Sequence, residues 1–348
     1  MINLLENLDI KEKRVLVRCD FNVPIDDKGE ILDDFRILKA IPTIKYLVEK
    51  KAKAILMSHL DPESEGQASK KYTLDKVGKR LSEALNISVI KVDDCIGLEA
   101  EKQSQKLNPG EILLLENLRF YKEETEGDEN FAEKLSLLGD IYVNDAFSVC
   151  HRNHSSITKI PKFLKSCAGL LLEKEIESLD KILENPQRPM IAVIGGKKVE
   201  SKAKFIEKIS EVSDFVLVSG LIKKEIIEKN IKFSYPEKII GPLDNLDALD
   251  IDQKTAELFR EKILNSKTIL WNGPFGKFED TLYSAGTLAL ALAIIESKAF
   301  SVVGGGETVE FLEKQDLIQS FSHVSTGGGA MLNYLSGDEL PGIKALQN

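Results

Sequence analysis

The chain has 348 residues, 43% of them hydrophobic and 30% charged, a composition typical of a globular protein with more than one hydrophobic core. Its formal net charge of −9 disfavours general affinity for nucleic acid, because the phosphate backbone attracts basic proteins. The longest apolar stretch, at 288–295, is too short to span a bilayer, so we expect no membrane partner.

The amino terminus and the cysteines both indicate a reducing compartment. The first six residues lack the basic and apolar regions of a signal peptide. Cys19, Cys95, Cys150 and Cys167 are far apart in the sequence and form no CxxC pair, which predicts free thiols. We therefore expect a cytoplasmic protein.

Short apolar runs alternate with helical patterns along the whole chain. They lie at 15–17, 54–57, 112–115, 141–143, 191–194, 215–218, 269–271 and 300–303. Continuous apolar runs of this length indicate strands that are buried on both faces, as in parallel sheets covered by helices. The predicted fold is α/β, with two Rossmann-like three-layer domains that are joined by a helix.

The residues that follow each apolar run are informative, because ligands of open α/β sheets bind beyond the carboxyl ends of the strands. In the first half these residues are basic and polar: Arg18-Cys19-Asp20-Phe21-Asn22, Ser58-His59, Glu116-Asn117-Leu118-Arg119, Asn144-Asp145-Ala146-Phe147 and then His151-Arg152-Asn153-His154. Arg36 opens a helix nearby. Guanidinium groups suit carboxylates and phosphates, and Asp or Asn can hold a hydroxyl. The pattern predicts a small, polyanionic, hydroxylated ligand.

Two other interpretations of these basic residues stay open. A single arginine or histidine after a strand is most often a solvated side chain or one half of a local ion pair. His151 and His154 could instead hold a metal, although their segment offers no Glu or Cys at ligand spacing. Recurrence at four strand ends favours a common anion site.

The boundary between the domains is expected near 168–185. Leu172, Ile176, Leu179 and Leu183 recur there at helical spacing, and prolines follow the segment. This helix is either a connector between domains or an ordinary crossover helix. We favour the connector, because the residues at the strand ends change in character on either side of it.

The strand ends of the second half are rich in glycine. They read Gly195-Gly196-Lys197-Lys198-Val199, Asn272-Gly273-Pro274-Phe275-Gly276, Gly304-Gly305-Gly306-Glu307-Thr308 and Ser325-Thr326-Gly327-Gly328-Gly329. Glycine lets backbone amides approach phosphate oxygens, and Lys198 and Lys202 add positive charge. This pattern predicts a nucleotide site without the Walker or GxGxxG motifs.

These motifs together resemble those of the phosphoglycerate kinase family, over nearly the whole chain and in the family's order. The first half contributes Arg18-Cys19-Asp20-Phe21-Asn22-Val23-Pro24, Ser58-His59-Leu60, Glu116-Asn117-Leu118-Arg119-Phe120, Asn144-Asp145-Ala146-Phe147 and His151-Arg152-Asn153-His154-Ser155-Ser156. The second half contributes Trp271-Asn272-Gly273-Pro274, Gly304-Gly305-Gly306 and the segment 321–330. The resemblance implies a triose-binding domain at 1–167, a hinge helix at 168–185, a nucleotide-binding domain at 186–333 and a tail at 334–348 that packs on the first domain.

The resemblance also implies a reaction: reversible transfer of a phosphoryl group between 1,3-bisphosphoglycerate and ADP, giving 3-phosphoglycerate and ATP, with Mg²⁺ as cofactor. The implied enzyme is a cytoplasmic, glycolytic monomer whose domains close around small-molecule substrates. Phosphoryl transfer needs in-line positioning and charge stabilisation rather than a nucleophilic side chain.

Family membership would assign the site residues in three groups. The triose would be bound by Asp20, Asn22, Arg36, His59, Arg119 and Arg152. The nucleotide would be bound by Gly195, Gly196, Lys202, Gly220, Asn272, Pro274, Glu279, Gly304, Gly305, Gly306, Glu307 and Thr308, with Glu307 also a ligand of Mg²⁺. The phosphoryl group in transit would be neutralised by Arg36, Lys198, Gly327, Gly328 and Gly329.

One departure from the family pattern affects the triose side. After His59-Leu60 the family has Gly-Arg-Pro, whereas this chain has Asp61-Pro62-Glu63. The missing arginine removes a charge-assisted hydrogen bond, worth about 1.5–3 kcal/mol, or about ten- to a hundredfold in affinity. Lys70 or Lys71 is a candidate replacement.

Three further departures lie on the nucleotide side. Glu307 replaces an Asp, so the metal or the backbone must shift to suit a longer side chain. Ser219-Gly220-Leu221 is a reduced glycine-rich strand, the region 220–250 is shorter than usual, and Ala248 replaces a glycine of the adenine pocket. We expect altered base selectivity.

The main alternative function is that of a degenerate relative, which binds nucleotide or triose without turnover. Arg36, Lys198 and the turn at 327–329 are retained, and these are the groups that a non-catalytic protein has no reason to keep. The sequence therefore favours an enzyme over a binding protein or a scaffold.

Overall fold

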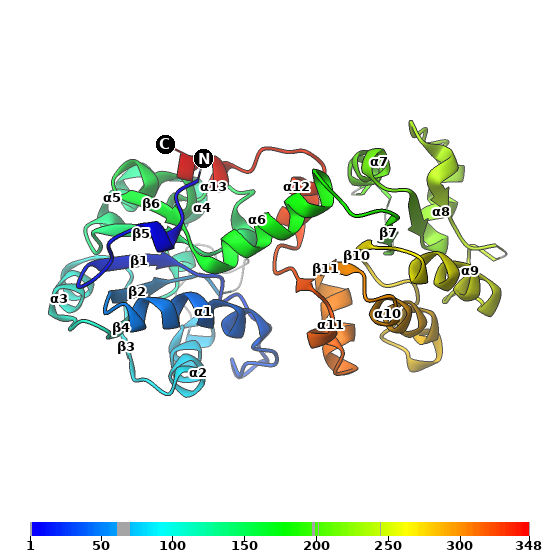
Figure 1. Ribbon diagram of the computed structural model, residues 1–348. Helices are drawn as coiled ribbons and strands as arrows, with labels where there is room; N and C mark the ends of the chain where they lie inside the picture. Colours follow the sequence, from blue (N-terminus) through cyan, green and yellow to red (C-terminus); the bar gives the residue numbers. More distant parts are fainter. Residues whose placement is uncertain (1, 61–69, 197–198, 201, 244, 348) are drawn as a thin grey trace. The chain divides into compact units, whose positions relative to one another are not determined.

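The computed structural model describes residues 2–60, 70–196, 199–200, 202–243 and 245–347, and the chain divides into two compact units (Figure 1). The amino-terminal unit comprises Met1–Lys174 and Glu339–Asn348, and the carboxyl-terminal unit comprises Glu175–Asp338. The boundary falls within helix α6 (Leu170–Leu183), inside the segment that the sequence marks as a connector.

The amino-terminal unit is built on a parallel sheet of six strands. From edge to edge they are β3 (Val89–Lys91), β4 (Ile112–Leu114), β2 (Lys53–Met57), β1 (Arg14–Arg18), β5 (Ile141–Asn144) and β6 (Lys165–Ala168). Val15, Leu16 and Val17 are all fully buried, because helices cover both faces of the central strand β1.

The carboxyl-terminal unit has a second parallel sheet of six strands. Their order is β12 (His323–Val324), β11 (Phe300–Gly304), β10 (Thr268–Asn272), β7 (Met190–Ile194), β8 (Phe215–Val218) and β9 (Ile239–Ile240). Every residue of β7 and β10 is buried, as expected for strands at the centre of a covered sheet.

The predicted α/β class with two parallel sheets is confirmed, and each of the eight apolar runs is a strand. The apolar runs did not include four strands, namely β3, β6, β9 and β12, and these are the edge strands of the two sheets. Of these four, only β12 was indicated, because the segment from Ser325 was interpreted as a strand end. An edge strand pairs on one side only, so it can be short and carry polar residues. β9 and β12 have two residues each.

α-Helices connect most successive strands in both units, and α12 and α13 follow the last strand. Those of the amino-terminal unit are α1 (Phe35–Glu49), α2 (Asp75–Leu85), α3 (Leu98–Lys106), α4 (Lys122–Glu126), α5 (Glu129–Ser136) and α13 (Pro341–Lys344). Those of the carboxyl-terminal unit are α7 (Ala203–Val212), α8 (Gly220–Glu228), α9 (Gln253–Leu264), α10 (Ala285–Ser297), α11 (Gly306–Lys314) and α12 (Gly329–Leu335). Helix α2 buries Val77, Leu81 and Leu85, which share one helical face.

Helix α6 differs from its predicted apolar stripe. Leu172 and Leu179 are fully buried as expected, but Ile176 and Leu183 are only partly buried. Glu175 is fully buried instead. The predicted stripe did not include Glu175, so the buried face of α6 differs from the predicted one at positions 175, 176 and 183.

Polar partners within the carboxyl-terminal unit explain the burial of Glu175. Its Oε2 lies 2.8 Å from His323 Nε2, and its Oε1 accepts hydrogen bonds from the amide of Thr326 at 2.6 Å and the hydroxyl at 2.8 Å. A buried carboxylate is tolerated when its oxygens are hydrogen-bonded in this way. Glu175 therefore ties the start of the unit to the segment after β12.

The last residues of the chain pack on the amino-terminal unit, beginning at Glu339 rather than at residue 334. The Gly342 amide donates to the Cys150 carbonyl at 2.8 Å, and Leu340 and Leu346 are buried. A Cβ at position 342 would lie 2.9 Å from Cys150 Cα, so glycine is required for this close approach.

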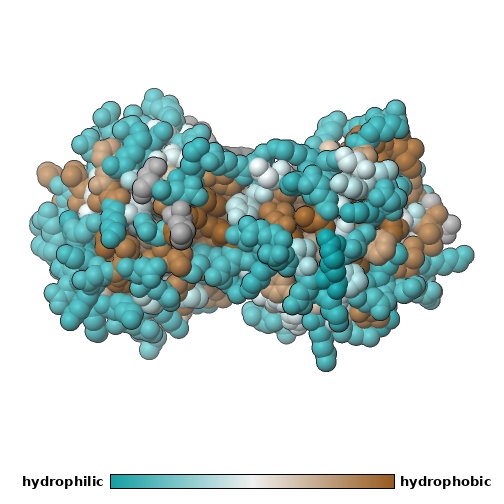
Figure 2. Space-filling model, turned by 45° about the horizontal axis from the view of Figure 1, so that its top comes forward, coloured by the Kyte–Doolittle hydropathy of each residue, from teal (hydrophilic) through white to brown (hydrophobic). Residues whose placement is uncertain are grey.

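Polar and charged side chains cover much of the face drawn in Figure 2. None of the helices among the described residues has the length and apolar character needed to cross a lipid bilayer.

The first prediction concerns the helix caps of the carboxyl-terminal unit. Asp252 caps α9 by accepting the Thr255 amide at 2.7 Å, whereas Ser284, at the same position of α10, makes no such bond. We expect Asp252→Ala to lower the free energy of unfolding by about 1 kcal/mol, and Ser284→Ala to lower it less. Urea unfolding would measure both, and equal losses would contradict this assignment of the caps.

Candidate active site

The strand register brings the polar strand ends of the amino-terminal unit to one edge of its sheet. Arg18, the last residue of β1, is level with Met57 of β2 and Asn144 of β5. The residues that follow these strands therefore begin side by side, as the sequence predicts for a parallel sheet.

Asp20 is the centre of one cluster at this edge. Its carboxylate forms an ion pair with Arg36 in the first turn of α1, and it accepts hydrogen bonds from the Ser148 hydroxyl and, at 3.0 Å, the Asn22 amide. Burial raises the pKa of Asp20, but the charge of Arg36 and these hydrogen bonds outweigh burial and lower it to about 2. Asp20 is therefore ionised and holds Arg36 in place.

His59 lies in a second cluster with Arg18, which is fully buried. Arg18 Nη2 is 3.2 Å from His59 Nδ1, and Arg18 Nε donates to Ser156 Oγ at 2.8 Å. Burial and the charge of Arg18 hold the pKa of His59 well below its usual range. His59 is therefore a neutral group among cations.

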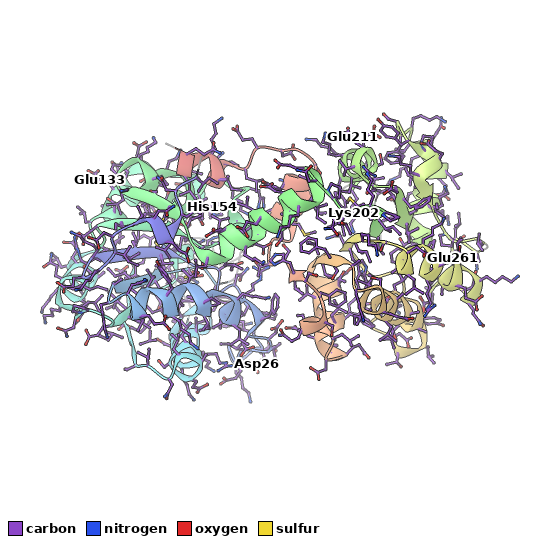
Figure 3. All side chains as sticks on the ribbon, in the orientation of Figure 1. Asp26, Glu133, His154, Lys202, Glu211 and Glu261 are labelled. Atoms are coloured by element: carbon purple, nitrogen blue, oxygen red, sulfur yellow. The ribbon has the colours of Figure 1, made fainter. Side chains whose placement is uncertain are left out.

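Arg119, Arg152 and two histidines form the third cluster. Arg119 is fully buried, and Arg152 Nε lies 3.4 Å from His151 Nε2. Burial, together with the charges of Arg119, Arg18 and Arg152, lowers the pKa of His154 to about 3. Figure 3 labels His154 within this unit. The structure thus brings the predicted arginines and histidines together.

A cluster of guanidinium groups favours an anion over a cation. Among the described residues, no group of three His, Cys, Asp or Glu side chains is placed to hold a metal ion. The structure therefore lends no support to a metal site at His151 and His154.

The predicted replacements for the missing arginine are only partly described. Residues 61–69 and the side chain of Lys70 lie outside the described set. Lys71 Nζ is 3.7 Å from Asp27 Oδ1 and lies over the ring of Tyr72. Lys71 is thus engaged with its own neighbours in this structure.

Lys202 lies beside the carboxyl end of β7 (Figure 3). It is a cation at the edge of the second sheet where the strands end, which we call the carboxyl-terminal rim. Its Nζ donates to the Gly195 carbonyl at 2.5 Å and lies 3.5 Å from the Asn272 carbonyl. Burial lowers the pKa of Lys202 to about 8, although the nearby Glu307 opposes the shift. The other predicted lysine, Lys198, lies outside the described residues.

Backbone hydrogen bonds join three glycine-rich strand ends to one another. The Gly195 amide donates to the Asn272 carbonyl at 2.9 Å, and the Gly196 amide donates to the Pro274 carbonyl at 3.0 Å. The Asn272 side chain donates from Nδ2 to the Gly304 carbonyl at 3.1 Å. These bonds fix the ends of β7, β10 and β11 relative to one another.

Thr308 also holds this rim together. Its hydroxyl accepts the Gly273 amide at 2.9 Å, which links the start of α11 to the turn after β10. Similarly, the Gly327 amide donates to Ser325 Oγ at 3.0 Å. Both predicted residues are therefore engaged within the rim, while Glu279 and Glu307 are exposed.

The glycines of the rim serve two different purposes. A Cβ on Gly195 would lie 2.1 Å from a backbone carbonyl of the neighbouring turn, and a Cβ on Gly304 would lie 2.4 Å from Met331 Sδ. By contrast, no atom lies within 4 Å of a Cβ built on Gly306 or Gly328. The first pair is explained by internal packing, which the sequence interpretation did not foresee, and the second pair faces open space.

Two other predicted residues can be placed. Gly220 begins α8, and a Cβ there would lie 2.7 Å from the Leu246 carbonyl. Gly305 has φ +101°, a conformation that favours glycine, and it caps α11.

We call the edge of the first sheet where its strands end the amino-terminal rim. Three residues that shape it were missed by sequence reasoning, namely Arg18 in its structural role, Glu124 and Ser148. Glu124 is fully buried although it lies in the run Lys122–Glu126, which reads as a solvated helix face. No sequence signal distinguishes it from its neighbour Glu123, which is only partly buried. Ser148 follows Asn144-Asp145-Ala146-Phe147 directly and could have been included with that motif.

A guanidinium-rich rim on one parallel sheet and a backbone rim with a half-buried lysine on the other define a two-domain α/β protein for anionic ligands. Enzymes that transfer phosphoryl groups between small molecules have this character, because their task is to position and neutralise charged groups.

Comparison with known proteins gives the family. The family model for phosphoglycerate kinase matches residues 5–233 and 224–338. The phosphoglycerate kinase of Dictyoglomus turgidum is 42% identical over 390 aligned positions, covering 99% of this chain and 98% of the relative, and that of Borrelia turicatae is 40% identical with 99% coverage of both. The chain belongs to the phosphoglycerate kinase family.

Solved structures agree with this assignment. The phosphoglycerate kinase of Coxiella burnetii is 34% identical, with a TM-score of 0.85 and coverage of 100% of this chain and 99% of the other. That of Pyrococcus horikoshii is 32% identical, with a TM-score of 0.88 and coverage of 100% and 98%.

The comparisons also bear on chain length. The alignment with the Dictyoglomus protein has 390 positions against 348 residues here, so the relative has residues without a counterpart. The two pieces of the family match meet at 224–233, within the region 220–250 that the sequence marks as shortened.

The second prediction separates the two kinds of glycine. We expect Gly195→Ala to lower the free energy of unfolding by about 1–3 kcal/mol or more, because the new Cβ overlaps a backbone carbonyl. Gly306→Ala has room and lies in the first turn of α11, so we expect unchanged or slightly higher stability. Urea or thermal unfolding of both variants tests this, and a destabilised Gly306→Ala would contradict the open space seen there.

Proposed function

We propose that this member of the family catalyses the reversible Mg²⁺-dependent transfer of a phosphoryl group between 1,3-bisphosphoglycerate and ADP, giving 3-phosphoglycerate and ATP. Family membership makes it a phosphotransferase. The observation that carries the assignment to this chain is the Asp20–Arg36 ion pair amid the converging basic groups at the end of β1. We further propose that it acts as a cytoplasmic monomer on small molecules.

The amino-terminal rim would bind the triose. Asp20 is ionised and Asn22 stands beside it, so this pair would accept and donate hydrogen bonds to a hydroxyl group. Arg119 and Arg152, with His59, would bind the carboxylate and phosphate. Because the arginines remain charged at any physiological pH, capture of the anion would depend on them rather than on a protonated histidine.

The carboxyl-terminal rim would bind the nucleotide phosphates. Lys202 would reach a phosphate by exchanging its bonds to the Gly195 and Asn272 carbonyls. The open space at Gly306 and Gly328 would allow backbone groups to approach phosphate oxygens. Asn272, Pro274 and Thr308 would support these turns, and Gly196, Gly220, Gly304, Gly305 and Glu279 would complete the nucleotide site.

Glu307 suits the Mg²⁺ that the family uses. It is exposed at the first turn of α11 and close enough to Lys202 to affect its pKa, and a carboxylate oxygen is the ligand type that Mg²⁺ prefers. When bound, the metal neutralises charge on the nucleotide phosphates. Arg36, Lys198 and the turn at 327–329 would neutralise the phosphoryl group in transit.

The third prediction tests transfer itself. With 3-phosphoglycerate and MgATP in a coupled assay, we expect turnover by the wild type and a fall of at least about a hundredfold in kcat/KM for Arg36→Ala, because charge-assisted bonds are lost. Arg80→Ala is the matched control. Arg80 Nε is 2.5 Å from Asp34 Oδ2, and its side chain is 32% exposed, against 33% for Arg36.

Two outcomes would overturn the proposal. A wild-type protein that binds both ligands in calorimetry but never turns over would be the degenerate relative. Equal activity of Arg36→Ala and Arg80→Ala would remove Arg36 from the reaction.

The fourth prediction concerns the base. Ala248 is exposed in the shortened region, where the family has a glycine, so contacts to adenine would be reduced. We expect KM values for ADP, GDP and IDP within about tenfold of one another, a spread that corresponds to about 1.4 kcal/mol. Ala248→Gly should lower the KM for ADP. A strong preference of the wild type for ADP would contradict the prediction.

A further inference from the structure

Arg18 is a buried cation whose guanidinium is held from several sides. Nε donates to Ser156 Oγ at 2.8 Å, Nη1 donates to the Cys19 carbonyl, and Nη2 lies 3.2 Å from His59 Nδ1. A guanidinium has five N–H donors and no acceptor, and it stays charged in proteins. Its position therefore dictates which atoms around it must be acceptors.

Glu124 balances this charge from helix α4. Its side chain is fully buried, and its Oε1 lies 3.8 Å from Arg18 Nη2. The carboxylate accepts the Ser156 hydroxyl at 2.5 Å and the Ser156 amide at 2.9 Å. The Ser156 hydroxyl has one hydrogen, which it donates to Glu124, so it can only accept from Arg18.

The segment that carries Ser156 is itself anchored. The Tyr142 hydroxyl donates to the Ser156 carbonyl at 2.6 Å, and the Ser155 hydroxyl donates to the Glu123 carbonyl at 2.7 Å. A fully connected buried network of this kind leaves few alternative positions for its members. Arg18 is thus locked with Nη2 directed at His59.

This geometry determines the protonation of His59. Because Nη2 can only donate, Nδ1 must accept, and the single ring hydrogen of the neutral imidazole must be on Nε2. His59 is 2% exposed, and the charged groups that act on it are Arg18, Asp20, Arg119 and Arg36. Burial and the three arginines disfavour the imidazolium, and only Asp20 opposes them.

We propose that Arg18, oriented by Glu124 and Ser156, is a positioning residue that fixes His59 as the neutral Nε2–H tautomer. His59 then meets an anionic ligand as a hydrogen-bond donor of defined direction and not as a cation. The role of the tautomer in binding rests on the proposed function, whereas the tautomer itself does not.

The direct test is nitrogen-15 NMR of the ligand-free, full-length protein labelled at histidine. The chain has four histidines, and His59→Gln identifies the resonances of His59. We expect an unprotonated Nδ1 and a protonated Nε2 that do not change between about pH 5 and 8, the range in which an ordinary histidine titrates. A protonated Nδ1, or titration within this range, would overturn the proposal.

Variants test the part played by Arg18. Arg18→Met/Glu124→Gln removes both buried charges together, so neither is left unpaired. We expect His59 to become a mixture of tautomers and its pKa to rise, while burial, Arg119 and Arg36 still hold it below its ordinary value. The triose KM should increase, because the donor at Nε2 is then present only part of the time, and the nucleotide KM should stay unchanged. If His59 stays the Nε2–H tautomer in this variant, Arg18 does not set it.

Two further variants serve as a control and as a substitute for the double variant. Arg14→Met is the matched control, because Arg14 begins the same strand but pairs with Asp140 at 2.6 Å and leaves His59 untouched. If the double variant fails to fold, Ser156→Ala removes the bridge alone and should give a smaller change in the same direction. Since the NMR needs no substrate, loss of the tautomer and failure of the kinase activity are separate results.

Discussion

The amino-terminal rim depends on two opposite charges, those of Arg18 and Asp20, which are buried two residues apart and are each balanced by a partner. Arg18 and Asp20 both lie at the end of β1, almost without contact with solvent. A buried charge without a partner costs several kcal/mol, so each must be matched. Glu124 and Ser156 match Arg18 from one side, and Arg36 matches Asp20 from the other. The buried charges at the end of β1 therefore compensate one another. The basic groups proposed to bind a ligand are held on top of these compensated pairs.

In the carboxyl-terminal rim, the polar groups are paired mainly with backbone carbonyls. The Gly195 and Gly196 amides are already paired with carbonyls of the next turn, and the Lys202 ammonium rests on two carbonyls. Such a rim needs close approach between main chains, which explains glycine at positions where no ligand is involved. Its shape depends on the register of β7, β10 and β11 and less on side-chain ion pairs.

The sequence predicted the internal strands and the residues that follow them, because both patterns are local. It failed where the determining contact lies far along the chain. Nothing near the edge strand β9 marks it, since its pairing partner β8 supplies the stability. Glu124 reads as one of several solvated acids until Ser156 and Arg18 surround it. Glu175, likewise, is buried only because Thr326 and His323 meet it.

The shortened region 220–250 can be tolerated because its end is anchored independently of its length. Asp250 accepts the amides of Ile251 at 2.9 Å and Gly286 at 2.8 Å, and the Leu249 carbonyl accepts the Lys277 amide at 2.8 Å. These bonds hold the turn that leads from β10 to α10, whatever precedes Asp250. Surface connections can lose residues at small thermodynamic cost when their ends stay fixed. The effect of the shortening on the proposed nucleotide site should therefore be confined to the base, while the turns at Gly195 and Gly306 keep their geometry.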